Sequence, residues 1–384
     1  MIDILSKVAA VRADLTQNLI DRAEAIDAAI LALLVRAHLL LLGPPGTAKS
    51  LLVREVTSRI EGASYFERLL TRFSTPEELF GPLSLSQLES DRYERVTAGT
   101  LVEAHIGFVD EVFKANSAIL DSLLTIINER VFHQGSGPVH VPLLSLFGAS
   151  NETPEDGSLA ALYDRFLIRV LVSPVADDDS MRLLLRHTEY TPEAEISLDE
   201  LQTAQHEVFH VPVTDAAVDA LIAVKHELEQ EGVAVSDRRW RQCTDLLKAR
   251  AWLDGDDAGA TEEHGVVLVN ALWSEPDQIR VVERCVSKVC APLNLEAVEL
   301  EDAARDIYDQ RPDPDDEHLT SRLEPLVKQL HDIRTRLETR IASVPESRSL
   351  RARQALKKVE GYHRDLSTLA LRSLSKLHTA PGAA

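Results

Sequence analysis

Gly43-Pro44-Pro45-Gly46-Thr47-Ala48-Lys49-Ser50 is the stretch of sequence that decides the fold. A short apolar run, Leu39 to Leu42, precedes it and is typical of a buried parallel strand. The glycines let backbone N–H groups face a polyphosphate, and the positive end of a following helix adds to the attraction. The pattern predicts a nucleotide-binding loop from Gly43 to Leu51, with Lys49 on the β- and γ-phosphates and Ser50 as a ligand of Mg²⁺.

One residue of this loop departs from the usual pattern. Glycine normally stands directly before the lysine, and here the residue is Ala48. Alanine is tolerable at this position if its backbone already has helical dihedral angles, although its methyl group then faces the phosphates.

Three later apolar runs also have the length of buried strands, and helical patterns separate them. This alternation predicts an α/β fold, in which helices flank both faces of a parallel sheet. Two helices are expected within residues 1–36, a helix start with proline at its first position in Thr75-Pro76-Glu77-Glu78, and a hairpin over residues 131–142. The three expected strands are Ile106–Val109, Leu143–Phe147 and Leu167–Val172.

Polar residues follow two of these strands. The acidic pair Asp110-Glu111 ends the strand that begins at Ile106, where buried carboxylates need a cation. Beside a phosphate loop, Asp110 can hold Mg²⁺ through its water shell, and Glu111 can polarise an attacking water. Asn151 follows the next strand and can orient that water or contact the γ-phosphate. An ordinary loop asparagine is the alternative interpretation of Asn151.

Arginines occupy two further positions of interest. Arg165 stands just before the last predicted strand, and Arg238 and Arg239 stand at the start of a predicted helix. A cation at a helix start opposes the helix dipole at a cost of roughly 0.3–1 kcal/mol, which a bound anion such as a nucleotide can offset. A surface salt bridge to Asp237 or Glu231 is the simpler explanation for the arginine pair.

After about Ser173 the strand signals stop and helical patterns take over. The sequence QRPDPDDE, residues 310–317, interrupts them. Beyond it, two apolar stripes at helical spacing, separated by residues 343–349, predict two long helices folded into a hairpin. Pro325 predicts that the first helix begins near Ser321 or is kinked. The five helices expected before this break span residues 177–187, 198–209, 215–230, 236–252 and 262–273.

The bulk composition excludes several classes of protein. The chain has 384 residues and a net charge of −21, which disfavours non-specific binding to nucleic acid. Its three cysteines are scattered, which indicates a reducing compartment rather than a disulfide framework. We find neither a membrane-spanning window nor the residue order of a signal peptide, so a cytoplasmic location is expected.

The order of these features resembles that of AAA+ ATPases, and more narrowly of the MoxR family in its regulatory ATPase variant (RavA) subgroup. The resemblance covers roughly residues 1–290, and Ala48 belongs to the family pattern. It rests on residues 71–84 (TRFSTPEELFGPLS), Arg92-Tyr93-Glu94-Arg95, Ile127-Asn128-Glu129-Arg130 and Ser236-Asp237-Arg238-Arg239-Trp240.

This resemblance implies roles for the residues already singled out. It makes residues 43–50 the Walker A motif and Asp110-Glu111 the end of Walker B. Asn151 becomes sensor 1, Arg165 an arginine finger and Arg238 sensor 2. We expect a nucleotide-binding core over residues 1–173, a helical lid over 174–295 and a helical extension over 296–384. The subgroup also has a β-containing C-terminal domain, for which the sequence gives no sign.

The resemblance further implies a hexameric ring that holds ATP and Mg²⁺ between subunits. Such a ring would do chaperone-like work on a protein partner, often one with a von Willebrand factor A (vWA) domain. Two other functions stay open at this point. One is a nucleotide-controlled scaffold with slow hydrolysis, and the other is a DNA-translocating motor, against which the net charge argues.

Overall fold

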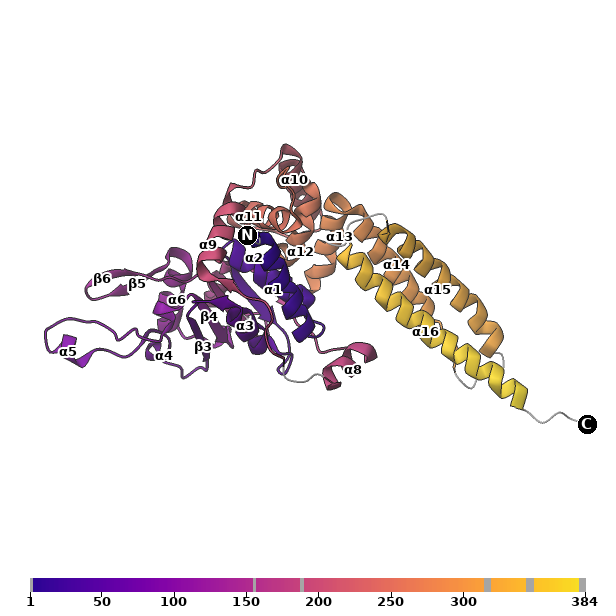
Figure 1. Ribbon diagram of the computed structural model, residues 1–384, viewed down its shortest axis with the longest axis horizontal. Helices are drawn as coiled ribbons and strands as arrows, with labels where there is room; N and C mark the ends of the chain where they lie inside the picture. Colours follow the sequence, from indigo (N-terminus) through magenta and orange to yellow (C-terminus); the bar gives the residue numbers. More distant parts are fainter. Residues whose placement is uncertain (1–2, 155–156, 187–189, 314–318, 343–348, 380–384) are drawn as a thin grey trace, which may run out of the picture. The chain divides into compact units, whose positions relative to one another are not determined.

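The computed structural model describes residues 3–154, 157–186, 190–313, 319–342 and 349–379 (Figure 1). The chain forms two compact units, which are described separately below. The first comprises Met1–Val218 and Gly232–Ile279, and the second comprises Asp219–Glu231 and Arg280–Ala384. The predicted boundaries after residues 173 and 295 stay a prediction.

A five-stranded sheet in the order β3-β4-β7-β1-β8 forms the centre of the first unit, and all its pairings are parallel. This confirms the predicted α/β fold. Sequence reasoning missed one strand, β3, whose residues Tyr-Phe-Glu-Arg-Leu mix apolar and charged side chains because it lies at the sheet edge. The strands are β1 (His38–Leu42), β3 (Tyr65–Leu69), β4 (Ile106–Asp110), β7 (Ser145–Ser150) and β8 (Phe166–Leu171).

Helices pack directly on this sheet. The two helices expected before residue 36 are both present, and the second of them, α2, packs on β1 and β8. The helix after the phosphate loop, α3, packs on β4 and β7. Strand β1 is therefore covered by α2 as well as paired on both sides, and Leu39 to Leu42 are almost fully buried. The longer helices up to β8 are α1 (Ile4–Asn18), α2 (Ala23–Leu34), α3 (Lys49–Ser58), α6 (Ser117–Glu129) and α7 (Gly157–Arg165).

Smaller elements confirm two local predictions. Helix α4 (Pro76–Phe80) begins with a capping box between Thr75 and Glu78, as its sequence indicates. Strands β5 (Val131–Gln134) and β6 (Gly137–His140) form the expected antiparallel hairpin. The remaining short elements here are β2 (Ile60–Glu61), α5 (Leu85–Leu88) and two 3₁₀ turns, Leu101–Glu103 and Val112–Lys114.

Two expectations for the chain after β8 are wrong. The strand signals do not stop entirely, because β9 (Ile196–Ser197) pairs with β2 in a two-stranded parallel sheet. The helix expected over 262–273 is instead a 3₁₀ segment, Glu262–Leu268, followed by the short α12 (Val269–Leu272). Gly265 and two β-branched valines after it weaken the α-helix there. The other predicted helices are α8 (Asp178–Arg186), α9 (Leu198–His210), α10 (Asp215–Gln230) and α11 (Asp237–Asp254).

The second unit is built from long helices. The two predicted helices are α15 (Leu319–Ile341) and α16 (Leu350–Thr379), and α14 (Pro292–Asp309) packs on both, so the hairpin is part of a three-helix bundle. Helix α15 begins two residues before the expected start at Ser321 and runs through Pro325. Helix α13 (Ile279–Cys290) precedes the bundle. Parts of the expected break and turn, residues 314–318 and 343–348, lie outside the described residues.

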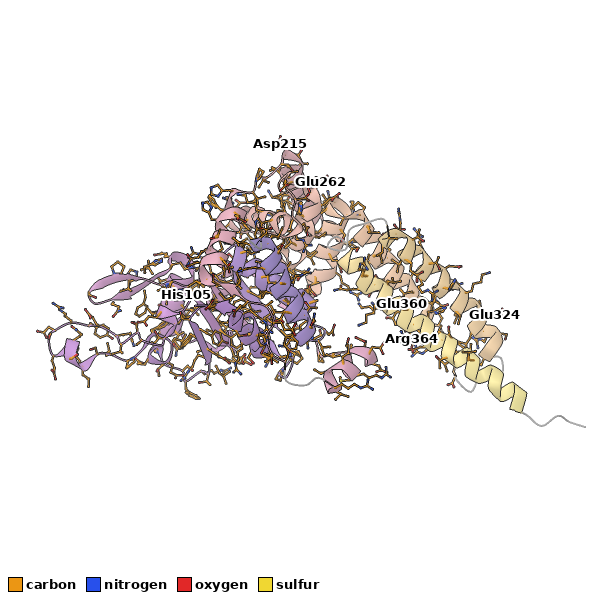
Figure 2. The ribbon with its side chains drawn as sticks, viewed as in Figure 1. His105, Asp215, Glu262, Glu324, Glu360 and Arg364 are labelled. Atoms are coloured by element: carbon orange, nitrogen blue, oxygen red, sulfur yellow. The ribbon has the colours of Figure 1, made fainter. Side chains whose placement is uncertain are left out.

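An apolar seam and a set of ion pairs hold this bundle together. Glu296 of α14 accepts hydrogen bonds from Arg336 and Arg340 of α15, and buried Glu301 accepts one from Lys358 of α16. Other charged side chains, such as those of Glu324 and Arg364, point outward (Figure 2). The buried seam includes Leu323, Leu330, Leu337, Ala355, Val359 and Leu366.

Among the helices that the structure describes, none is both long and apolar enough to cross a membrane.

The seam generates a stability prediction. Leu337→Ala should destabilise the bundle by about 2–5 kcal/mol, because it leaves a cavity at a side chain that is 1% exposed. Hydrogen exchange of α14, α15 and α16 is the measurement, and protection there should fall while that of β1 stays unchanged. Leu371→Ala is the matched control, since Leu371 is 67% exposed. Equal loss of protection in both variants would contradict the packing described here.

Candidate functional site

Three parallel strands bring the predicted phosphate loop and the polar residues to one edge of the sheet. Strand β1 ends at Leu42, which pairs with Ser150 at the end of β7, and Gly43 N–H donates to the Ser150 carbonyl at 3.0 Å. The adjacent β4 ends at Asp110. Because carboxyl ends of parallel strands share an edge, Lys49, Asp110, Glu111 and Asn151 gather around the loop.

The loop holds its lysine on the inside. Lys49 is buried, and its Nζ donates to the carbonyls of Gly43 at 2.6 Å and Pro44 at 2.9 Å. Thr47 Oγ1 donates to the Pro44 carbonyl at 2.9 Å. Burial lowers the pKa of Lys49, and the nearby carboxylates of Asp110 and Glu111 oppose that shift. The ammonium group therefore lies where an anion and these carboxylates can compete for it.

The two glycines of the loop are required for different reasons. Gly43 has a φ of +152°, and a Cβ there would lie 2.2 Å from the Val172 carbonyl oxygen, so no side chain fits. Gly46 has a φ of +82° and no atom within 4 Å of a Cβ position, so its requirement is conformational and the loop is open in front of it.

The backbone of Ala48 does not have the helical dihedral angles that would make alanine tolerable at this position. Its backbone is left-handed, with φ +65° and ψ +27°, and it forms the N-cap of α3. Helical dihedral angles therefore do not explain why alanine is tolerated here. A left-handed alanine costs roughly 1–2 kcal/mol, which explains why glycine is usual before the lysine. The Ala48 carbonyl accepts a hydrogen bond from Leu52 N–H at 2.9 Å, which ties this residue to the first turn of α3.

The acidic pair and the asparagine lie close together, because the strands that precede them, β4 and β7, end at the same edge of the sheet. Glu111 is also left-handed, with φ +51°, and its N–H donates to Asp110 Oδ1 at 3.0 Å. Asn151 Nδ2 donates to Glu111 Oε1 at 2.9 Å and so orients that carboxylate. A cavity of about 660 Å³ opens beside them, and Arg72 and Lys114 also line it.

Sequence reasoning missed an arginine that supports the loop. Arg22 is buried at the start of α2, and its Nε donates to the Thr47 carbonyl at 3.1 Å. Burial lowers the pKa of Arg22. No local pattern marks this residue, because its role depends on how α2 packs beside α3.

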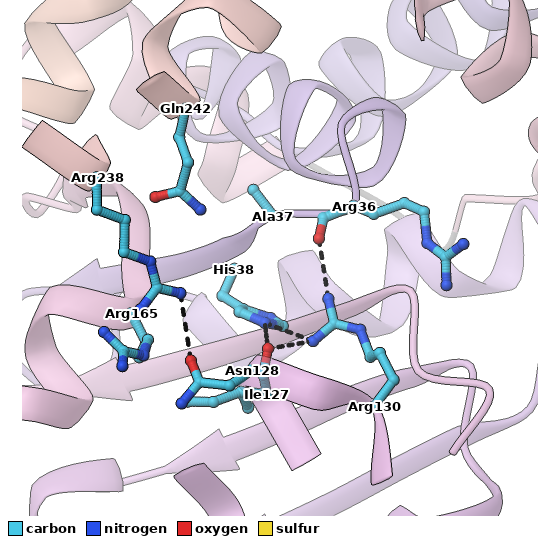
Figure 3. A pocket seen from close by; sticks show the side chains of 9 residues that line it. All are labelled: Arg36, Ala37, His38, Ile127, Asn128, Arg130, Arg165, Arg238 and Gln242. Carbon is cyan, nitrogen blue, oxygen red and sulfur yellow. Dashed lines mark hydrogen bonds between the residues drawn. The ribbon is translucent and has the colours of Figure 1, made fainter. Parts of the chain in front are cut away.

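The predicted arginines Arg165 and Arg238 lie together in a second cavity, of about 360 Å³ (Figure 3). Arg238 Nη2 donates to Asn128 Oδ1 at 3.2 Å. Arg165 Nε is buried and has no hydrogen-bond partner among the described residues. Burial and the neighbouring Arg165 both lower the pKa of Arg238. The cavity is lined by Arg36, Ala37, His38, Ile127, Asn128, Arg130, Arg165, Arg238 and Gln242, a strongly cationic set.

This cavity lies at the amino end of β1, whereas the phosphate loop follows the carboxyl end of the same strand. Arg165 directly precedes β8, and Phe166 pairs with His38 at the start of β1. The five residues of β1, which span about 13 Å, separate that end from the loop after Leu42. The structure thus brings Arg165 and Arg238 together but does not bring them to the chain's own Lys49.

The structure also distinguishes Arg238 from Arg239. Arg238 is exposed and faces the cavity, whereas Arg239 is buried and donates to the Asp164 carboxylate at 3.0 Å. Arg239 thus forms an ion pair, but this pair is not the surface salt bridge of the alternative interpretation, since Arg239 is buried and its partner is Asp164.

Arg130 and His38 build the wall of the cavity, and their roles were not predicted. Arg130 is left-handed at the end of α6, and its guanidinium donates to the carbonyls of Ile127, Arg36 and Leu144. His38 Nδ1 accepts from Leu146 N–H, so the neutral ring donates from Nε2 to the Ile127 carbonyl. Burial lowers the pKa of His38 to about 3, which keeps the ring uncharged.

Residues 6–209 match a family model described as the MoxR domain in the MoxR-vWA-beta-propeller ternary systems, and residues 216–286 match an AAA lid domain. The first match covers more than half of the chain. The chain belongs to the MoxR family of AAA+ ATPases.

Individual relatives agree with this placement in the MoxR family. An uncharacterised protein of Methanocaldococcus jannaschii is 43% identical over 281 residues, which is 73% of this chain and 74% of that protein. The Mycobacterium tuberculosis protein named Chaperone MoxR1 is 26% identical over 205 residues, 52% of this chain and 53% of that one. A putative ATPase from Cytophaga hutchinsonii shares the fold, with a TM-score of 0.60 at 17% identity over 74% of this chain and 95% of its own.

MoxR-family membership and the AAA+ fold imply that the chain binds a nucleotide and hydrolyses ATP. The open phosphate loop and the cluster of Lys49, Asp110, Glu111 and Asn151 have the chemistry for both.

The strain at Ala48 yields a prediction about stability. Ala48→Gly should raise the free energy of unfolding by about 1 kcal/mol, because glycine adopts the left-handed conformation without steric cost. The matched control is Ala10→Gly in the exposed face of α1, which should lower it by roughly 0.5–1 kcal/mol. Denaturant unfolding measures both values. A loss of stability in both variants would contradict the left-handed assignment.

Proposed function

We propose that this chain is an ATP-hydrolysing, ring-forming MoxR ATPase that remodels or activates a protein partner. The observation that carries the proposal is the separation of its catalytic groups. The loop and the carboxylates lie at one edge of the sheet, and Arg165 and Arg238 lie at the other. Such a chain holds two complementary halves of a hydrolytic site.

The residues at the first edge fit ATP with Mg²⁺. Hydroxyl and carboxylate oxygens are ligands that Mg²⁺ prefers, and Ser50 and Asp110 supply them beside the buried ammonium of Lys49. When bound, the ion neutralises charge on the β- and γ-phosphates. Glu111 then acts as the base that accepts a proton from the attacking water, and Asn151 fixes the orientation of its carboxylate.

The residues at the second edge fit the phosphate groups of a nucleotide on a neighbouring subunit. Cationic side chains dominate that cavity, and the buried Nε–H of Arg165 has no partner within the part of the chain that the structure describes. Arginine gives planar, multidentate contacts to phosphate oxygens. A head-to-tail contact, which sets one subunit's second edge against the next subunit's first, closes into a ring when the rotation permits. We propose a ring on this basis, and six subunits because the resemblance to AAA+ ATPases implies a hexamer.

The partner is proposed from the family. The matching family model is described by its place in a MoxR-vWA-beta-propeller system, and one relative carries the name chaperone. These descriptions support a partner with a vWA domain and chaperone-like work on it. The narrower likeness to the RavA subgroup rests on sequence motifs and stays part of the proposal.

The catalytic carboxylate can be tested directly. Glu111→Gln should slow turnover by about 10²–10⁴-fold, because the amide cannot accept the proton, while ATP still binds. Turnover is measured as phosphate release, and binding as the affinity for a fluorescent ATP analogue. The matched control, Glu89→Gln on an exposed turn, should change neither. Normal turnover in Glu111→Gln would remove this residue from the reaction.

The shared site is tested by mixing variants. Arg165→Ala should lower turnover by about 10³–10⁵-fold while its own loop still binds ATP. Lys49→Ala should not bind ATP at its own loop, but its Arg165 can still complete the site of a neighbouring subunit. In a random mixture, roughly a quarter of head-to-tail interfaces join an intact loop to an intact arginine, so turnover should return.

Arg182→Ala, at an exposed arginine of α8, serves as the control and should turn over normally. Mixtures that stay inactive would show that each chain completes its own site. A partner effect that needs equimolar protein but no turnover would favour the scaffold function instead, and DNA-stimulated hydrolysis would favour the motor.

A further inference from the structure

The Asp164 side chain lies between two arginines, Arg239, which is buried, and Arg165, which lines the second cavity. Its Oδ1 accepts a hydrogen bond from Arg239 Nη2 at 3.0 Å, and its backbone carbonyl accepts another from the same nitrogen at 3.2 Å. Its Oδ2 lies 3.7 Å from Arg165 Nη1. One carboxylate therefore connects a residue of α11 with the arginine that faces the cavity.

Arg239 is rigidly placed. It is 4% exposed, and its Nη1 donates to the Ala271 carbonyl at 3.0 Å. The guanidinium thus contacts both the turn before β8 and the end of α12. Because Arg238 directly precedes Arg239 on α11, the backbone that carries Arg238 is fixed by the same contacts.

A second buried arginine contacts the same end of α7. Arg169 of β8 is 1% exposed, donates to the carbonyls of Tyr163 and Trp273, and lies 4.0 Å from the centre of the Tyr163 ring. The Tyr163 hydroxyl donates to the Ser274 carbonyl. Both residues that precede Arg165 are therefore anchored, whereas its own side chain faces the cavity.

We propose that Asp164 and Arg239 form a positioning pair, which presents Arg165 and Arg238 together as one rigid unit to a neighbouring subunit's nucleotide. This inference rests on the proposed function, because it assumes that the two arginines act on a nucleotide. Neither member of the pair touches the nucleotide. They set the distance between Arg165 and Arg238, and each guanidinium must reach its phosphate oxygen from that fixed geometry.

The first test variant is Asp164→Asn, which keeps an oxygen for Arg239 but removes the charge between the two guanidiniums. Its turnover number should fall about 10- to 100-fold, because misplaced catalytic groups lose rate steeply. The affinity of its own loop for a fluorescent ATP analogue should stay within about twofold, since the loop is at the other edge of the sheet. Turnover equal to that of the unmodified chain would overturn the proposal.

Mixing separates positioning from a general loss of structure. Asp164→Asn keeps an intact loop, so turnover should return when it is mixed with Lys49→Ala, which supplies well-placed arginines. A mixture of Asp164→Asn with Arg165→Ala should show no such recovery, because neither variant supplies well-placed arginines. If the first mixture stays inactive while Arg165→Ala with Lys49→Ala recovers, the positioning pair is refuted and the shared site stands. If neither recovers, the shared site itself fails, and the inference fails with it.

Arg239→Lys is the second variant, for the case in which Asp164→Asn does not fold. Arg239→Lys keeps the positive charge but loses the planar guanidinium group. Its turnover should therefore fall, and recover in mixtures, as described for Asp164→Asn. The matched control is Arg250→Lys, which alters another arginine–aspartate pair on α11, where Arg250 donates to Asp254 at 2.8 Å. Arg250→Lys should turn over at the normal rate, and an equal loss there would show that any buried ion pair of the helix has this effect.

Discussion

The burial of strand β1 between β7 and β8 is the constraint on which the rest of the site depends. Leu39 to Leu42 are paired on both sides and covered by α2, so the strand cannot shift without exposing its apolar side chains. Its carboxyl end positions the phosphate loop, and its amino end borders the arginine cavity. One strand therefore fixes the distance between the two halves of the proposed shared site.

Four arginines, of which three are buried and Arg130 is half-buried, stabilise the segments at both ends of this strand. Arg22 donates to the phosphate loop, Arg130 to three carbonyls near the start of β1, and Arg169 and Arg239 to the turn before β8. Arginine suits these places because its planar fork can satisfy several carbonyls at once and keeps its charge. The resulting rigidity matters for a site completed by a second subunit, since each half must be preformed.

The sequence predicts the first edge of the sheet better than the second. Asp110, Glu111 and Asn151 follow recognisable strands, and the geometry of parallel strands then brings them together. The cavity with Arg165 and Arg238 needs contacts between residues far apart in the chain, such as Arg238 with Asn128, which no local pattern reveals. The left-handed backbone of Ala48 was missed for a related reason, because alanine itself favours helical angles. Strand β3 was missed because charged side chains interrupt its apolar residues, whereas the other edge strand, β8, is largely apolar and was predicted.

The central claim is that one chain cannot complete its own hydrolytic site. The most direct measurement is the ATPase rate per subunit over a dilution series, with the assembly state determined at each concentration. A site shared between subunits predicts that the rate per subunit falls towards zero as the assembly dissociates and reaches a plateau once it is complete. A rate per subunit that stays constant down to the monomer would contradict the account.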